Sequence, residues 1–186
     1  MWNGSKNTTS DGNREVVKGM PWWRLDRMWP DDYLGYANWT PLIWAGDTWE
    51  APDHLHGGQP YASFNDSSQL GLSVRAAHTN EPGRKIGALV LMIRTRATYG
   101  IAGKVHFKRW AGSGEANLLI LRRDSAPSKR VVEIKKIRLP ADGEASIEPI
   151  MLELDAGQEI AFLPVQNQEN DAGNLTFTEL KVAAKR

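Results

Sequence analysis

The sequence contains no cysteine in its 186 residues, which excludes disulfide bonds, thiolate-bound metal ions and cysteine nucleophiles. It also has no apolar run near the roughly 20 residues that a membrane-spanning helix needs. The longest such run, Ile86 to Ile93, has the length of a strand. The net charge is small, with 23 basic and 22 acidic side chains. We therefore expect neither insertion into a membrane nor electrostatic binding to nucleic acid.

The first residues also lack a targeting signal. The stretch from Met1 to Ser5 has no apolar core of the kind that a signal peptide contains. We expect either that the protein stays inside the cell or that a leader or parent chain has been removed. Residues 1–19 are rich in Asn, Gly, Ser and Thr, which predicts a flexible arm or linker. The remaining residues, 20–186, suit one well-buried domain and are short for two.

Tryptophan is concentrated between Met20 and Tyr61, which holds six of the eight tryptophans in the chain. Prolines recur about every ten residues in this stretch, so long helices are excluded and short extended pieces joined by turns are expected. Each indole is apolar with a polar N–H. The rings therefore either seal one side of a core or form a platform for a ligand.

From Leu70 onward, apolar side chains alternate with polar ones, and turn residues recur every eight to twelve positions. This pattern predicts an all-β antiparallel jelly-roll β-sandwich of about eight strands, with the tryptophan-rich segment packed on one face or edge. In the last strand the apolar positions before and after the middle alternate out of phase. A bulge between Phe177 and Leu180 would place them on the same face of the sheet. The strands are expected at 70–77, 86–93, 99–107, 118–121, 131–139, 147–154, 158–165 and 175–182. Core positions include Leu72, Val74, Leu89, Leu91, Ile101, Val105, Phe107, Leu119, Leu121, Val132, Ile134, Leu152, Leu154, Ile160, Phe162, Leu175 and Phe177.

Three motifs in the second half carry a family resemblance. The stretches Leu154 to Phe162, Asp171 to Phe177 and Tyr99 to Val105 resemble jelly-roll, galactose-binding-like carbohydrate-binding modules attached to bacterial polysaccharide-degrading enzymes. The resemblance covers roughly residues 44 to 184 and leaves Trp22 to Trp44 unmatched. It implies a β-sandwich, a place in a larger multidomain enzyme, and an extracellular or periplasmic setting.

The leading hypothesis for function is a non-catalytic carbohydrate-binding module that binds a polysaccharide or oligosaccharide. Indole faces pack on the C–H faces of sugars, while neighbouring polar groups bind the hydroxyls. Binding residues concentrate in loops at an end or edge of such a fold, so we expect the site beside the tryptophan-rich segment. The expected platforms are Trp39, Trp44 and Trp49, and the expected hydroxyl partners are Asp47, His54, His56 and Gln59.

Two other function classes stay open. Exposed tryptophans also occur at the centres of protein interfaces, which would make the chain an interaction or assembly domain. A small jelly-roll lyase or metal-dependent enzyme is the third possibility, because the His-x-His spacing of His54 and His56 suits a transition metal.

A structural calcium ion is also expected, because the resembling modules often hold one. Oxygen ligands for it would come from Asp155, Asp171 and Asn174 at strand ends.

Overall fold

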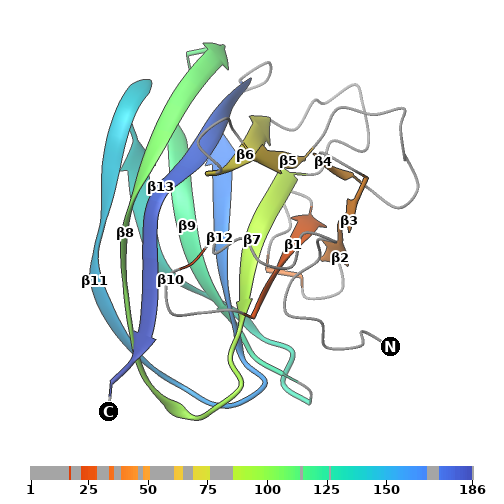
Figure 1. Ribbon diagram of the computed structural model, residues 1–186, viewed down its shortest axis with the longest axis vertical. Helices are drawn as coiled ribbons and strands as arrows, with labels where there is room; N and C mark the ends of the chain where they lie inside the picture. Colours follow the sequence, from red (N-terminus) through yellow and green to blue (C-terminus); the bar gives the residue numbers. More distant parts are fainter. Residues whose placement is uncertain are drawn as a thin grey trace.

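The computed structural model of the chain describes residues 17, 22–28, 34–35, 39–45, 48–50, 61–64, 69–75, 86–113, 115–125, 127–166 and 172–185. Regular structure in these residues consists of strands alone, arranged in two antiparallel sheets that pack face to face (Figure 1). No described helix is long and apolar enough to cross a membrane. The predicted all-β sandwich is confirmed.

Each sheet combines strands from the tryptophan-rich segment with strands from the second half of the chain. The six-stranded sheet has the order β10-β9-β12-β7-β1-β2 and the seven-stranded sheet the order β11-β8-β13-β6-β5-β4-β3. The strands are β1 (Trp23–Met28), β2 (Thr40–Pro41), β3 (Ile43–Trp44), β4 (Thr48–Glu50), β5 (Ala62–Phe64), β6 (Leu70–Arg75), β7 (Ile86–Met92), β8 (Ala97–Ala111), β9 (Ala116–Arg123), β10 (Val131–Leu139), β11 (Asp142–Leu154), β12 (Glu159–Gln166) and β13 (Ala172–Ala184). The tryptophan-rich segment thus supplies one edge of both sheets, as the sequence predicted.

Aromatic pairs join the two sheets across the core. Phe162 on β12 meets Phe177 on β13 edge to face, with ring centroids 5.8 Å apart. Trp23 on β1 meets Trp49 on β4 in the same manner, at 6.1 Å. Such pairs stabilise a core by about 0.5–1.5 kcal/mol beyond the area that they bury. The second pair anchors the N-terminal strands to the sandwich.

The strand boundaries follow the sequence closely in the second half. β7 is buried at every position, as expected of a continuously apolar run, and β10 spans the predicted residues. The last strand carries the predicted bulge, because its register against β8 shifts between Phe177 and Glu179. Gly103 lies opposite this bulge, where a Cβ atom would lie only 2.3 Å from the Glu179 carbonyl oxygen. Only glycine fits there.

Three of the predicted core residues are half-buried instead: Val132, Ile134 and Leu152. Leu152 lies on β11, at the edge of the seven-stranded sheet. In β10 the buried residues are Val131 and Leu139. A register shift between Glu133 and Lys135 changes the parity along this strand, and β10 has a neighbour on one side only.

The N-terminal arm needs a second correction at its one described position. Val17 is fully buried in the core between the sheets, so the domain includes at least this part of residues 1–19.

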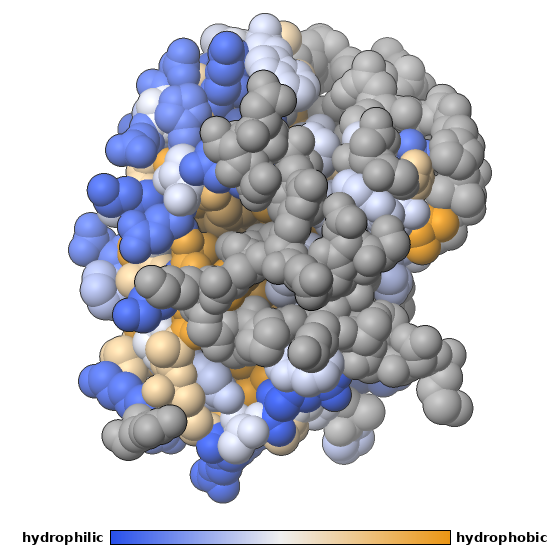
Figure 2. Space-filling model, in the orientation of Figure 1, coloured by the Kyte–Doolittle hydropathy of each residue, from blue (hydrophilic) through white to orange (hydrophobic). Residues whose placement is uncertain are grey.

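The six-stranded sheet is apolar on both of its faces. Its inner face contributes to the core between the sheets, while its outer face carries a second buried cluster. That cluster consists of Trp39, Ile86, Ala88, Val90, Leu119, Leu121, Val131, Ala161, Leu163 and Val165. The region of β8 and β11 in the seven-stranded sheet instead presents hydrophilic side chains, which form the blue margin at the left of Figure 2. The two outer faces therefore differ in chemistry, and the candidate site lies on the apolar one.

Candidate functional site

Three loops meet at one end of the sandwich. They join β7 to β8, β9 to β10, and β11 to β12. Gly157 lies where they converge: its N–H donates to the carbonyl of Ile93 at 2.8 Å, and a Cβ atom on it would lie 3.4 Å from the Ser125 side chain. Its φ of 91° is a left-handed conformation that glycine adopts without strain. The turn 155–158 is thereby fixed against both neighbouring loops.

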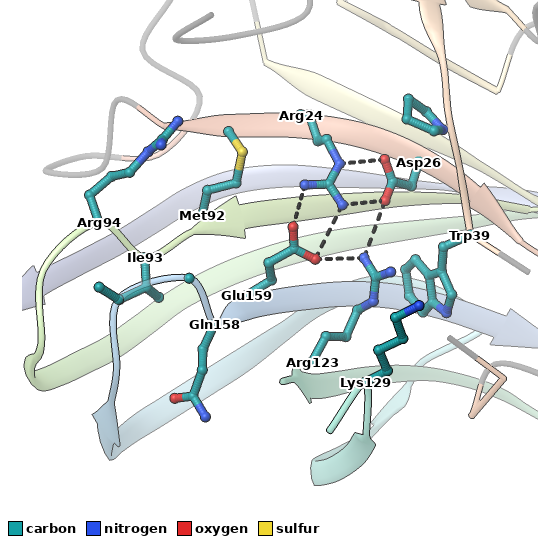
Figure 3. Close-up of a pocket in the computed structure, with 13 residues that line it drawn as sticks. Arg24, Asp26, Trp39, Met92, Ile93, Arg94, Arg123, Lys129, Gln158 and Glu159 are labelled. Carbon is teal, nitrogen blue, oxygen red and sulfur yellow. Dashed lines mark hydrogen bonds and ion pairs between the residues drawn. The ribbon is translucent and has the colours of Figure 1, made fainter. Parts of the chain in front are cut away.

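A pocket of about 900 Å³ opens beside these loops, on the outer side of the six-stranded sheet (Figure 3). Its apolar lining includes the ends of β2 and β7 and one tryptophan, and its charged lining comes from β1, β9, β12 and the loops that follow β7 and β9. The lining residues are Arg24, Asp26, Trp39, Pro41, Met92, Ile93, Arg94, Arg123, Lys129, Ala156, Gly157, Gln158 and Glu159. A concave, mixed apolar and polar surface of this size fits a small-molecule or saccharide ligand.

Four charged side chains form one wall of this pocket. Arg24 on β1 donates two hydrogen bonds to Asp26, at 2.7 and 2.8 Å, and also binds Glu159 on β12. The Nη1 atom of Arg123 on β9 donates to Glu159 at 2.7 Å and to Asp26 at 3.3 Å. The dashed lines in Figure 3 connect the four residues. We call them the charged quartet. Its two arginines fix both carboxylates in position.

The charged quartet is largely removed from water. Asp26 is 1% exposed and Arg123 is 3% exposed. Burial acts to lower the pKa of the Arg24 guanidinium, but the charges and hydrogen bonds of Asp26 and Glu159 outweigh burial and raise that pKa above its ordinary value. Two cations and two anions balance, which is the condition under which buried charges are tolerated.

Trp39 connects the charged quartet to the apolar part of the pocket. The guanidinium carbon of Arg123 lies 4.4 Å from the centroid of the Trp39 ring, within the range of a cation–π interaction. Trp39 is 8% exposed and belongs to the apolar cluster on the outer face of the sheet. It therefore presents only a strip of its ring to the pocket.

Two further cations line the mouth of the pocket. The Arg94 guanidinium lies 4.7 Å from the centroid of the Trp22 ring. Lys129 belongs to the β9–β10 loop, and Figure 3 shows its side chain extending toward the part of the pocket that holds Trp39 and Arg123. Both cations are exposed to solvent.

The three predicted tryptophan platforms occupy different environments. Trp39 lines the pocket. Trp49 is 0% exposed and packs inside the core, so its predicted role as a platform is wrong: no ring face is open to a ligand. Trp44 is half-buried against Trp49, with ring centroids 4.5 Å apart, and does not line the pocket. The predicted hydroxyl partners Asp47, His54, His56 and Gln59 lie outside the described residues.

The predicted calcium ligands do not converge. Asp155 follows Leu154, which pairs with Ala97 at the start of β8, whereas Asn174 pairs with Lys108 near the end of that strand. A strand rises about 3.3 Å per residue, so the two side chains are separated by roughly 35 Å and cannot bind one ion. Asp171 lies outside the described residues. In the described part of the chain, no three His, Asp or Glu side chains gather as a metal site would require.

Sequence reasoning did not identify the charged quartet. A signal was present in β1, where Trp23 and Leu25 alternate with Arg24 and Asp26. This is the two-residue period of a strand with one apolar and one charged face. The partners on β9 and β12 are 97 and 135 residues away from β1 in sequence. Nothing in one sequence reveals contacts over such separations.

Comparison with known proteins gives structural likeness only. No family model matches the chain, and no curated protein matches it in sequence. A xylan-binding domain, CBM22-1 of Xyn10C from Paenibacillus barcinonensis, is 12% identical with a TM-score of 0.41, over 66% of this chain and 75% of that one. TmCBM61, solved with β-1,4-galactotriose, is 12% identical with a TM-score of 0.38, over 96% and 99%.

A third similar structure has a different description. The K3 cleaved adhesin domain of Lys-gingipain from Porphyromonas gingivalis is 14% identical with a TM-score of 0.41, over 87% of this chain and 91% of that one. Carbohydrate-binding modules, which the sequence motifs resemble, are thus among the similar structures. At these scores the likeness assigns no ligand to this chain.

Proposed function

We propose that this chain is a non-catalytic carbohydrate-binding module, accessory to a polysaccharide-degrading enzyme outside the cell or in the periplasm. The observation that carries the proposal is the pocket of about 900 Å³ at the end of the six-stranded sheet. It combines an apolar strip with fixed polar groups, which are the two kinds of surface that a sugar ring needs.

The apolar strip suits the C–H face of a pyranose. Trp39, Met92 and Pro41 line the same pocket, and a tryptophan and a methionine both make favourable contacts with apolar faces of rings. Because Trp39 exposes only a strip, we expect the sugar to contact the edge of the indole together with Met92, and not to stack across the whole ring.

The polar wall suits sugar hydroxyls. The arginines and carboxylates of the charged quartet hold one another in place through the hydrogen bonds described above. A ligand that binds such pre-positioned groups loses little free energy in ordering the protein. The turn 155–158 adds Gln158, whose side chain accepts from the Asp155 N–H and donates to Asp124, both at 2.8 Å. Its position is thus fixed before a ligand arrives.

The same contacts favour binding over hydrolysis. Glycosidases place a sugar between two carboxylates, one of which donates a proton. In the charged quartet the arginines Arg24 and Arg123 occupy the space between Asp26 and Glu159 and bind oxygens of both acids. A glycosidic bond cannot enter between them without breaking this network.

A panel of polysaccharides in affinity gel electrophoresis tests the proposal. The native chain is run through gels that contain xylan, galactan, mixed-linkage glucan, homogalacturonan, alginate or carrageenan. We expect retardation on at least one of them. The variant Ala156→Trp places a large ring at the mouth of the pocket, since Ala156 is exposed and lines it, and should abolish that retardation.

The matched control is Ala141→Trp. Ala141 is also exposed, and its carbonyl accepts from Arg109 at the opposite end of the sandwich. This variant should be retarded as the native chain is. A folded native chain that no polysaccharide retards would overturn the proposal, and equal retardation of both tryptophan variants would move the site away from this pocket.

A further inference from the structure

We infer that the saccharide bound in this pocket carries an anionic group, either a carboxylate or a sulfate, and that Lys129 binds it. The inference rests on the proposed carbohydrate-binding function and specifies the charge of the ligand. It is derived from the balance of charge in the pocket and from the backbone of one loop.

The lining of the pocket has more cations than anions. Its charged residues are four cations and two carboxylates. Asp26 and Glu159 are both engaged by arginines within the charged quartet, so the quartet as a whole is neutral. Beyond the quartet, Lys129 adds a positive charge at the mouth of the pocket. An anionic ligand would meet a positive potential there, whereas a neutral sugar would gain nothing from it.

Lys129 is the surplus cation whose position the loop determines. The β9–β10 loop is closed by backbone hydrogen bonds from Asp124 to Arg130, at 2.8 Å, and from Lys129 to Ser125, at 3.2 Å. No ion pair of Lys129 with a described residue is present. Its ammonium therefore remains able to bind a ligand.

The backbone conformation at Lys129 favours glycine over lysine. Its φ of 48° is the one positive value among the described residues other than glycine. Glycine adopts this conformation readily, while a lysine is strained in it. The loop thus gains no stability from a lysine at this position. What the lysine supplies is a cation at the pocket.

This geometry provides an unusual test, because Lys129→Gly removes the ammonium and relieves the backbone strain together. The variant should melt at the same temperature as the native chain or higher, so a loss of binding cannot be attributed to unfolding. Lys129→Gln removes the charge alone. Its matched control is Lys136→Gln, since Lys136 is an exposed lysine on β10 that does not line the pocket.

Binding is measured by isothermal titration calorimetry with fragments of homogalacturonan, alginate and carrageenan. Each is compared with a neutral partner: the carboxyl-reduced form of the first two and the desulfated form of the third. These pairs distinguish a carboxylate from a sulfate as the source of the charge. A hydrogen-bonded charge pair corresponds to about tenfold or more in affinity. We expect at least one anionic fragment to bind about tenfold more tightly than its neutral partner.

The preference should disappear in Lys129→Gly and Lys129→Gln, should persist in Lys136→Gln, and should weaken as salt is added. Equal affinity for the charged and neutral partners, or binding of neutral polysaccharides alone, would overturn the inference and leave the proposed function intact. Failure of every saccharide, charged or neutral, to bind would overturn the proposed function itself.

Discussion

The guanidinium carbon of Arg123 lies 4.4 Å from the centroid of the Trp39 ring. This contact joins a charged network to an apolar cluster at the end of one sheet. Arg123 is fixed by Asp26 and Glu159 through its Nη1 atom, and it fixes in turn one face of the indole. The pocket is therefore shaped by contacts that exist before any ligand arrives.

Replacement of Trp39 by Phe should weaken ligand binding more than it weakens the fold. A phenyl ring retains apolar contact with the outer-face cluster, but it interacts less strongly with Arg123 and presents less surface to a sugar. We expect the affinity to fall between about twofold and tenfold. Calorimetric titration of both proteins with the same oligosaccharide measures this. Unchanged affinity would remove Trp39 from the site.

Replacement of Trp49 by Ala should weaken the fold more than it weakens ligand binding. The ring is fully buried between the sheets, where it contacts both Trp23 and Trp44. Truncation of such a side chain costs roughly 3–5 kcal/mol of unfolding free energy, which urea denaturation followed by circular dichroism would detect. A cost below about 1 kcal/mol would show that the ring is not part of the core.

The charged quartet predicts a non-additive mutant cycle. Asp26→Leu alone leaves Arg24 and Arg123 with one carboxylate between them and should cost about 3–5 kcal/mol. The double variant Arg24→Met with Asp26→Leu leaves Arg123 and Glu159 as a balanced pair, so it should cost less than the sum of the two single variants. Urea midpoints of the four proteins provide the comparison. Simple additivity would mean that the residues do not act as a unit.

The raised pKa of Arg24 also predicts how the stability of an Arg24→Lys variant compares with that of the native chain at alkaline pH. Its carboxylate neighbours raise its pKa, so its contribution to stability is present at lower pH and is lost only when the pH rises through that raised value. This lies beyond ordinary alkaline conditions for an arginine, whereas a lysine ordinarily loses its proton near pH 10.4. The stability deficit of Arg24→Lys relative to the native chain should therefore stay constant up to about pH 10.4 and widen as the pH rises above it. A deficit that does not widen above about pH 10.4 would contradict this assignment.

Sequence reasoning identified those parts of the fold that depend on local pattern. The apolar run of β7 and the bulge of β13 both follow from the spacing of apolar residues. The burial of β10 was missed, because a register shift against β9 changes parity without a local signal. The arrangement of strands into the two sheets also depends on non-local pairing.

The location of the binding site beside the tryptophan-rich segment stays a prediction. Of the three expected platforms, Trp39 lines the candidate pocket. The sequence does not distinguish Trp39 from Trp49, because both lie in the same tryptophan-rich segment. The pairing of strands determines which of the two rings enters the core between the sheets. The sequence also does not indicate that Arg123 and Glu159 contact β1, because they lie about a hundred residues or more from it along the chain.

The place of the binding site is tested most directly by a nuclear magnetic resonance titration of the ¹⁵N-labelled chain with the oligosaccharide that the gel panel identifies. We predict that the perturbed backbone amides cluster at Ala156, Gly157 and Gln158, at Met92 and Ile93, and in the β9–β10 loop near Lys129, since these residues surround the pocket. Perturbation confined to the outer face of the seven-stranded sheet, for example around the exposed Trp110 and Met151, would contradict it.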